Sequence, residues 1–359
     1  MPMKVLISGG AGFVGVWLCR LFKQQYPDWQ VTAFDNLRRR GSELNLPVLR
    51  DAGVQFLHGD IRNRGDLTDL PGRYDFMVEA SAEPSVHAGT GSGSPKYVLD
   101  TNLVGTLNCL EFARLRCGGI IFLSTSRVYS ISALRNIRLS ETATRLVPEQ
   151  QKQPHGFSSA GISERFPIVG SGFRSFYGTS KLASELFLEE YGANYDYPAV
   201  INRCGVIAGA GQFGKTDQGV FTLWVARHMF GGELSYTGFG GKGKQVRDLL
   251  HPKDLFELIE RQLPMLDKLR GDVFCIGGGL EGSVSLHEYT QLCRDVTGRE
   301  IVIGSTPTTA DVDVPYYVTD YAKARDAFSW EPAIRPRQIV EDIHSWLTAN
   351  SRQLRPLFT

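Results

Sequence analysis

Short apolar runs alternate with amphipathic segments along the first two-thirds of the chain. Buried strands are predicted at residues 4–8, 30–34, 54–57, 75–80, 119–124 and 198–202. Between the first two runs, apolar side chains recur three and four positions apart, which places them on one face of a helix: Val14, Trp17, Leu18, Leu21 and Phe22. A repeated strand–helix–strand order predicts a parallel sheet with right-handed crossovers.

The pattern changes after about residue 205. Stretches rich in Gly, Lys and Gln at 205–219 and 237–245 separate shorter helical segments. We therefore predict an α/β protein with a doubly wound parallel sheet in residues 1–204 and a smaller C-terminal substrate-binding lobe in residues 205–359, partly interleaved with the first. Residues 142–176 form a long polar insertion, and insertions of that length are usually functional or disordered.

The composition narrows the class of protein. The 359 residues carry a net charge of +1, with 42% hydrophobic and 21% charged residues, which is ordinary for a globular protein and predicts no nucleic-acid partner. No apolar run reaches the ~18–20 residues of a membrane span, and the N-terminus lacks the apolar core of a signal peptide. The six cysteines include no CxxC pair, so we expect reduced thiols, no metal site and a cytoplasmic protein.

A glycine-rich stretch connects the first predicted strand to the first predicted helix. Gly9, Gly12 and Gly15 are spaced GxxGxxG, and such glycines let the backbone approach a pyrophosphate at a helix N-terminus. A tight turn alone would also explain the glycines. Asp35 ends the second predicted strand, 20 residues beyond Gly15, where a carboxylate accepts hydrogen bonds from a ribose diol. The combination predicts a Rossmann-type dinucleotide site that prefers NAD to NADP.

Two further groups bear on that site. Arg38, Arg39 and Arg40 could favour a 2′-phosphate, but beside Asp35 we interpret them as a solvated basic loop or as contacts to substrate phosphates. Asp60 follows the third predicted strand and is suitably placed to hold the adenine amino group.

A candidate proton-transfer pair lies further along, inside a helical pattern. Tyr177 and Lys181 are four residues apart and so share one face of the helix. A tyrosine with the usual pKa of about 10 is a poor base, and an adjacent ammonium together with a positive nicotinamide would favour its phenolate. Thr125, at the end of the fifth predicted strand, offers a hydroxyl to the reacting group. The glycine loop, this threonine and YxxxK form, in that order, a strong combined signal for catalysis.

These residues resemble the extended short-chain dehydrogenase/reductase superfamily, whose members modify nucleotide-linked sugars, and the resemblance covers nearly the whole chain. The segments 161–164, 173–178, 211–213, 217–219 and 243–251 resemble the CDP-paratose 2-epimerase (CDP-tyvelose epimerase) subfamily. The resemblance implies a tightly held NAD that takes hydride from a sugar ring carbon, with C2 favoured, and returns it to the opposite face. It also implies a nucleotide-diphosphate sugar as substrate and a homodimer or homotetramer.

The resemblance assigns roles to residues. It implies that Tyr177 is the acid/base, that Lys181 binds the nicotinamide ribose and that Thr125 hydrogen-bonds the reacting hydroxyl. The residues expected to contact the cofactor are Gly9, Gly12, Phe13, Val14, Gly15, Asp35, Asn36, Asp60, Ile61, Ala80, Ser81, Asn102, Lys181 and Cys204. Those expected to contact the substrate are Ser126, Gln212, Gln218, Gln245 and Arg247.

The chain also departs from relatives in ways that bear on the reaction. Where many relatives carry a His-Leu-Ala-Ala-Gln-like stretch, residues 79–83 read Glu-Ala-Ser-Ala-Glu. A 4,6-dehydratase would need an Asp-Glu pair directly after Thr125, and the chain has Ser126 and Arg127 there. Decarboxylases usually carry Glu at the second of these positions. A nucleotide-sugar 4-epimerase therefore remains the main alternative, followed by a 4,6-dehydratase or a decarboxylase and, last, a non-catalytic NAD-binding scaffold.

Overall fold

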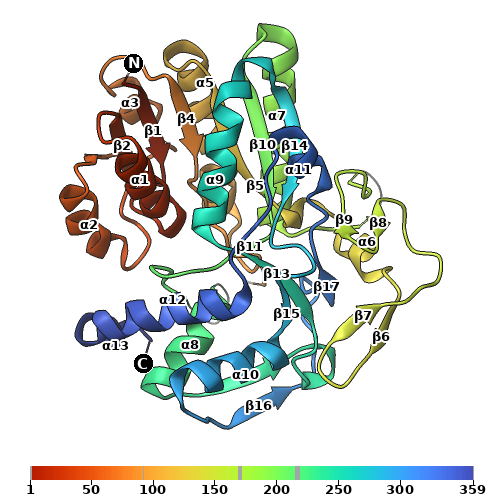
Figure 1. The fold of residues 1–359 in the computed structure, drawn as a ribbon. Helices are drawn as coiled ribbons and strands as arrows, with labels where there is room; N and C mark the ends of the chain where they lie inside the picture. Colours follow the sequence, from red (N-terminus) through yellow and green to blue (C-terminus); the bar gives the residue numbers. More distant parts are fainter. Residues whose placement is uncertain (1, 92, 169–171, 215–218, 359) are drawn as a thin grey trace.

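The computed structural model describes residues 2–91, 93–168, 172–214 and 219–358, and its centre is a seven-stranded sheet (Figure 1). All neighbouring strands of this sheet run parallel, in the order β14-β10-β5-β4-β1-β2-β3. The strands are β1 (Lys4–Ser8), β2 (Gln30–Asp35), β3 (Gln55–His58), β4 (Phe76–Glu79), β5 (Ile120–Thr125), β10 (Ala199–Cys204) and β14 (Arg270–Ile276). The prediction of a doubly wound parallel sheet is confirmed.

Helices cover both faces of the sheet, because alternate strand residues are apolar on each side. One face packs on α1 (Phe13–Gln25), α9 (Pro252–Gln262) and α11 (Ala322–Phe328). The other packs on α3 (Arg64–Thr68), α5 (Gly105–Arg116) and α7 (Phe176–Tyr195). In β1, for example, Val5 and Ile7 belong to the first core and Leu6 to the second.

The buried face of α1 is rotated from the predicted one. Leu18 and Phe22 are buried as expected, together with Gly15 and Cys19. Trp17, predicted on the same face, is only partly buried, and its indole Nε1 donates to the carbonyl of Ala210 at 2.7 Å. The helix therefore presents its glycine side to the sheet and its tryptophan to the chain that enters the second lobe.

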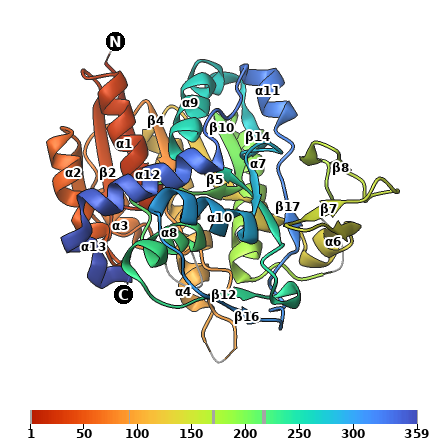
Figure 2. The same ribbon diagram turned by 60° about the horizontal axis from the view of Figure 1, so that its bottom comes forward.

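The second lobe follows β10 and contains a small mixed sheet around β13 (Figure 1). Its strands are β11 (Val206–Ile207), β13 (Val246–Leu250), β15 (Ser283–Ser285) and β17 (Tyr316–Tyr317), with a separate pair, β12 (Leu234–Thr237) and β16 (Ile303–Thr306). Its helices are α8 (Val220–Phe230), α10 (Leu286–Thr297), α12 (Pro336–Ala349) and α13 (Ser351–Phe358). Figure 2 shows α12 lying across α8 and α10, and these helices share one apolar core. The chain leaves this lobe to add α9 and β14 to the central sheet.

The polar insertion folds into short antiparallel pairs. They are β6 (Leu139–Glu141) with β7 (Leu146–Pro148), and β8 (Phe157–Ser158) with β9 (Gly161–Ile162). Ile162 and Phe166 are buried with side chains of α6 (Ile131–Arg135), of β14 and of the 312–317 segment, so this part of the insertion packs into a core that it shares with later parts of the chain. The remaining short helices are α2 (Leu46–Asp51) and α4 (Lys96–Leu99).

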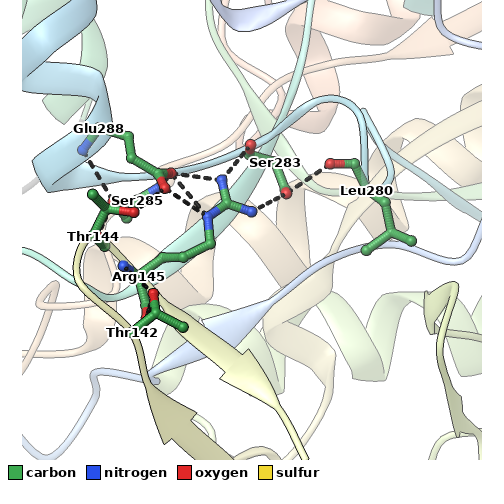
Figure 3. Close-up of polar contacts among 7 residues, drawn as sticks. All are labelled: Thr142, Thr144, Arg145, Leu280, Ser283, Ser285 and Glu288. Atoms are coloured by element: carbon green, nitrogen blue, oxygen red, sulfur yellow. Dashed lines mark hydrogen bonds and ion pairs between the residues drawn. The ribbon is translucent and has the colours of Figure 1, made fainter.

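A polar cluster fastens the β6–β7 hairpin to the second lobe (Figure 3). The Arg145 guanidinium reaches both Glu288 oxygens, with its shortest contact at 2.6 Å, and also donates to the hydroxyl and carbonyl oxygens of Ser283. Thr144 donates to Glu288 at 2.7 Å. Glu288 and Ser285 form the capping box that begins α10. The hairpin is thus bonded to a helix N-terminus more than 130 residues later in the chain.

Candidate active site

Two positions of the glycine loop between β1 and α1, Gly9 and Gly15, leave no room for a side chain. A Cβ at Gly15 would lie 2.1 Å from the carbonyl oxygen of Gly9, and Gly9 itself has a φ of +68°. Asp35 lies beside the loop, where its carboxylate accepts from the backbone N–H of Ala11 at 3.2 Å and of Leu37 at 2.7 Å. Burial raises the pKa of Asp35, and these N–H donors oppose that effect. The loop lies where the strand order reverses between β1 and β4, which is the usual dinucleotide position in such sheets.

The second and third strands end in a charged cluster suited to the adenosine half of a dinucleotide. Asn36 donates to Asp60 at 2.9 Å, and Arg62 forms an ion pair with the same carboxylate at 2.6 Å. Burial acts to raise the pKa of Asp60, but Arg62 and Asn36 lower it to about 2. Arg38 and Arg62 both stack on the ring of Tyr97. The Arg38 guanidinium therefore packs against the face of the Tyr97 ring.

The loop after β4 runs against the glycine loop. A Cβ at Gly9 would lie 2.9 Å from the backbone of Ala80 and Ser81, so these predicted cofactor residues border the site. Asn102 is fully buried, and its amide both accepts from and donates to the Glu83 backbone, at 2.8 and 2.9 Å. Its side chain therefore fixes the loop after β4 through the Glu83 backbone, and its contact with the cofactor stays a prediction.

The remaining predicted cofactor residues differ in how accessible they are. Phe13 and Val14, in the first turn of α1, are partly exposed. Ile61 is buried against Gly105 at the start of α5. Cys204 ends β10, and burial raises the pKa of its thiol to about 12. The thiol is therefore protonated near neutral pH.

Thr125 and Tyr177, the two predicted hydroxyl residues of the catalytic centre, lie together. Tyr177 is in the first turn of α7, and Thr125 ends β5 and caps the short helix η3 (Ser126–Val128) by accepting from the Arg127 N–H at 3.2 Å. Burial raises the pKa of Tyr177 to about 12; the Thr125 hydroxyl and the Arg127 charge act to lower it, and Cys204 and Glu79 act to raise it. Burial is therefore the main influence on the proton of the phenol, and the neighbouring polar and charged groups act beside it.

Lys181 lies one turn further along α7, and its ammonium is almost completely buried. Its Nζ is 3.6 Å from Glu79 Oε2 and 4.0 Å from the centre of the Phe122 ring. The sequence indicated Glu79 only as a departure from relatives, and the ion pair was not predicted. It could have been suspected, because a carboxylate in an apolar strand needs a cation nearby.

A second charged residue continues the spacing of four on the same helix face. Glu185 is buried, pairs with Arg203 at 2.7 Å and accepts a hydrogen bond from Ser124. Ser124 and Arg203 belong to β5 and β10, so Glu185 ties together the two strand ends that carry Thr125 and Cys204. Sequence reasoning missed this residue, although its position four residues after Lys181 was visible.

The predicted substrate residues are more scattered. Ser126 is buried beside Thr125. Gln212 is engaged with the Ile207 carbonyl and the Thr222 hydroxyl. Gln245 donates to the Thr237 carbonyl, and its Oε1 is buried without a partner among the described residues. Gln218 lies outside the described residues.

Arg247, on β13, forms its hydrogen bonds with backbone carbonyls. Its guanidinium donates to the carbonyls of Val246 and Val314, both at 2.7 Å. Within the described ranges no carboxylate forms an ion pair with it. Burial, and next the charge of Arg127, lower the pKa of Arg247 to about 9. The Asp313 and Asp248 charges act on this pKa in the opposite direction. A partly desolvated guanidinium that hydrogen-bonds carbonyls is suited to an anionic ligand.

Comparison with known proteins decides the family. The profile of the NAD dependent epimerase/dehydratase family matches residues 5–277. The chain belongs to this family. It is 32% identical to the CDP-paratose 2-epimerase of Salmonella typhi, over 97% of this chain and all of that protein. It is 26% identical to a dTDP-glucose 4,6-dehydratase of Actinoplanes sp., over 97% and 98% of the two chains.

Solved structures of the NAD dependent epimerase/dehydratase fold superimpose closely. One is the UDP-glucose 4-epimerase of Bifidobacterium longum in complex with NAD⁺ and UDP, with a TM-score of 0.78 and 23% identity, covering 99% of this chain and all of that one. The predictions of family and of NAD as cofactor are confirmed. Among the helices that the structure describes, none is long and apolar enough to cross a membrane.

Proposed function

We propose that this protein is an NAD-dependent nucleotide-sugar epimerase that oxidises a ring carbon, C2 by preference, and reduces it again from the other face. The observation that carries the proposal is the surroundings of Thr125 and Tyr177. Tyr177 can exchange a proton with a ring hydroxyl of the sugar. Ser126 and Arg127, the two residues after Thr125, are unsuited to the acid and base steps of an elimination.

The residues of the chain supply proton transfer and orientation. When bound, NAD accepts hydride from the ring carbon and supplies it again. Tyr177 takes the proton of the ring hydroxyl and later returns it, while Thr125 hydrogen-bonds the same oxygen. The glycine loop and Asp35 hold the dinucleotide, and the Arg247 guanidinium binds the substrate diphosphate.

Elimination of water needs groups that Ser126 and Arg127 do not provide. A dehydratase must protonate the departing hydroxyl and remove a ring proton. A serine hydroxyl has too high a pKa for this near neutral pH, and a guanidinium stays charged. In the structure, Arg127 donates to the Val312 carbonyl at 3.0 Å. These residues favour a reaction in which the sugar keeps all its atoms.

The choice of C2 rests on the full-length likeness to a CDP-paratose 2-epimerase at 32% identity. A 4-epimerase is the second candidate, because oxidation at C2 or C4 needs the same protein groups and differs only in how the sugar lies. The solved 4-epimerases are 20 to 23% identical and so support the fold alone.

The test uses CDP-, UDP- and dTDP-linked hexoses carrying deuterium at C2 or at C4. We expect a product of unchanged mass, inverted at C2, with the deuterium retained. Inversion at C4 would favour the 4-epimerase. A product lighter by one water with a keto group would overturn the epimerase proposal in favour of a dehydratase, and deuterium lost to solvent would replace hydride transfer by deprotonation. Bound NAD without turnover of any substrate would support a non-catalytic scaffold.

A further inference from the structure

The β6–β7 hairpin lies against β13, the strand that carries Arg247. The side chain of Leu139, the first residue of β6, packs on a buried cluster formed by Val246, Tyr316 and Val318. Val246 directly precedes Arg247 in β13, and Tyr316 is its register partner in β17. The hairpin is therefore in direct contact with the centre of the small mixed sheet.

The hairpin also bonds β15 at the two residues that flank the register partner of Arg247. Ser283 accepts from the Arg145 guanidinium at its hydroxyl and carbonyl oxygens, at 3.1 and 2.9 Å (Figure 3). Ser285 donates from its hydroxyl to the Thr144 carbonyl at 2.7 Å. The neighbouring strand is thus fixed on both sides of the position that lies opposite Arg247.

The chain that enters β13 is held by the same hairpin. The backbone N–H of Leu146 donates to the Lys244 carbonyl at 2.9 Å, and the Lys244 ammonium donates to the Thr142 carbonyl at 2.6 Å. Glu141 accepts from the ammonium groups of Lys242 and Lys244, at 2.9 and 2.8 Å. The hairpin therefore bonds the segment just before β13 as well as the strand beside it.

Among these contacts, those of Arg145 should hold the hairpin most firmly. The side chains of Glu141 and Lys242 are 45% and 58% exposed, so water and salt screen their attraction and it contributes little. The Arg145 and Glu288 side chains are 29% and 25% exposed. The planar guanidinium bonds both Glu288 oxygens and also reaches Ser283, which fixes its orientation. Loss of Arg145 should therefore release the hairpin from β15.

The place of the Arg247 guanidinium depends on this arrangement of strands. It donates to the carbonyl of Val246 in its own strand and to that of Val314, in the chain that leads into β17, both at 2.7 Å. A hydrogen bond to a phosphate oxygen weakens steeply when its distance and angle depart from their best values. A small shift of β13 would therefore weaken the grip of Arg247 on an anion.

We propose that the β6–β7 hairpin is a positioning element of the substrate site, and that Arg145 is the positioning residue through which it fixes β13 and the Arg247 guanidinium. The inference rests on the proposed function in that Arg247 binds the substrate diphosphate. It gives the first part of the polar insertion a role in substrate binding.

The experiment measures the binding of nucleoside diphosphates to the NAD-bound protein by calorimetry. CDP, UDP and dTDP are titrated into the parent, and the tightest of them is used for all variants. We expect Arg145→Gln to raise its Kd about tenfold, the lower end of what a lost hydrogen bond to a charged group costs. Arg138→Gln is the matched control, because the Arg138 guanidinium donates to Gln151 within the insertion, and Ile343→Val, in the core of α12, controls for lowered stability alone. Both controls should bind like the parent.

A double-mutant cycle tests whether Arg145 acts through Arg247. Arg247→Gln alone should weaken binding, and Arg145→Gln added to it should cause no further loss. Losses that multiply, or an Arg145→Gln variant that binds like the parent, would overturn the inference and leave the diphosphate role of Arg247 intact. If Arg247→Gln binds like the parent, or the parent binds none of the three diphosphates, that role is itself wrong and the inference falls with it.

A second variant keeps the test decisive if Arg145→Gln does not fold. Arg145→Lys keeps a positive charge for Glu288, but a single ammonium does not reproduce the fork that joins Glu288 to Ser283 (Figure 3). We expect a smaller rise in Kd, which should again vanish in the Arg247→Gln background, and the same outcomes decide. No turnover is measured, so a failure of the epimerase proposal would leave this result readable.

Discussion

Replacing Glu288 by glutamine removes one charge from the cluster that fastens the β6–β7 hairpin to α10 (Figure 3). Burial acts to raise the pKa of Glu288, but hydrogen bonds from Arg145, the Ser285 backbone and Thr144 lower it from 4.5 to about 2. That difference corresponds to at most about 3.4 kcal/mol of unfolding free energy. The two side chains are 29% and 25% exposed, so solvent screening reduces the effect, and we expect a loss of about 2 kcal/mol at pH 7.

The loss should depend on pH in a defined direction. A carboxylate whose pKa is lower in the folded protein stabilises the fold fully above its unfolded value of about 4.5, and this contribution disappears as the pH falls through about 2. The difference between the parent and Glu288→Gln should therefore be constant from pH 6 to 8. At pH 3.5 it should fall to about six-tenths of its pH 7 value.

The assay is urea unfolding followed by tryptophan fluorescence at pH 7, 5 and 3.5. The matched control is Glu300→Gln, because Glu300 faces Arg294 at 3.5 Å but is 79% exposed, and we expect it to lose less than about 0.5 kcal/mol. A Glu288→Gln variant as stable as this control at pH 7 would refute the reasoning. A difference from the parent that stays constant down to pH 3.5 would show that the charge is not responsible.

Three further outcomes follow from the candidate site. The NAD-free protein should bind NAD at least about tenfold more tightly than NADP in calorimetric titrations, because we expect the Asp35 carboxylate to accept hydrogen bonds from the ribose diol. Equal affinities would show that it does not. Tyr177→Phe should keep its fold and bound NAD but lose epimerisation by at least ~10²-fold, and turnover near the parent rate would exclude Tyr177 as acid/base. Gly15→Ala should lower both Tm and NAD content, because the new Cβ would lie 2.1 Å from the Gly9 carbonyl oxygen; a variant that keeps both would contradict this account of the loop.

The features that could be predicted from the sequence are those set by local spacing. The glycine loop, Asp35 and the Tyr177–Lys181 pair were located because strand ends and helical spacing fix their positions within a few residues. The Glu79–Lys181 ion pair could not be found this way, because it depends on which face of β4 meets α7. The same limit explains Trp17, whose indole meets Ala210, nearly 200 residues later in the chain.

The polar insertion shows a second limit. Its composition indicated a loop, and the structure forms hairpins there, with Ile162 and Phe166 buried in a core shared with α6 and the 312–317 segment. The bonds from Arg145 to Glu288 join positions 143 residues apart. The sequence around Arg145 does not indicate Glu288 as its partner, and the reverse is also true. The contact that fixes the β6–β7 hairpin could therefore be found only from the structure.

β14 is synthesised well after its neighbour β10, and this order affects how the protein folds during translation. The inner strand β10 has its outer edge covered only by β14, which is translated about 70 residues after β10 ends, or roughly 4 to 14 seconds later at a usual rate of synthesis. During that interval the backbone N–H and C=O groups along one edge of this buried strand are open to pairing with other nascent chains. We therefore expect the emerging polypeptide to depend on chaperones until residue 276 has left the ribosome, and a cut after residue 204 to give an aggregating fragment.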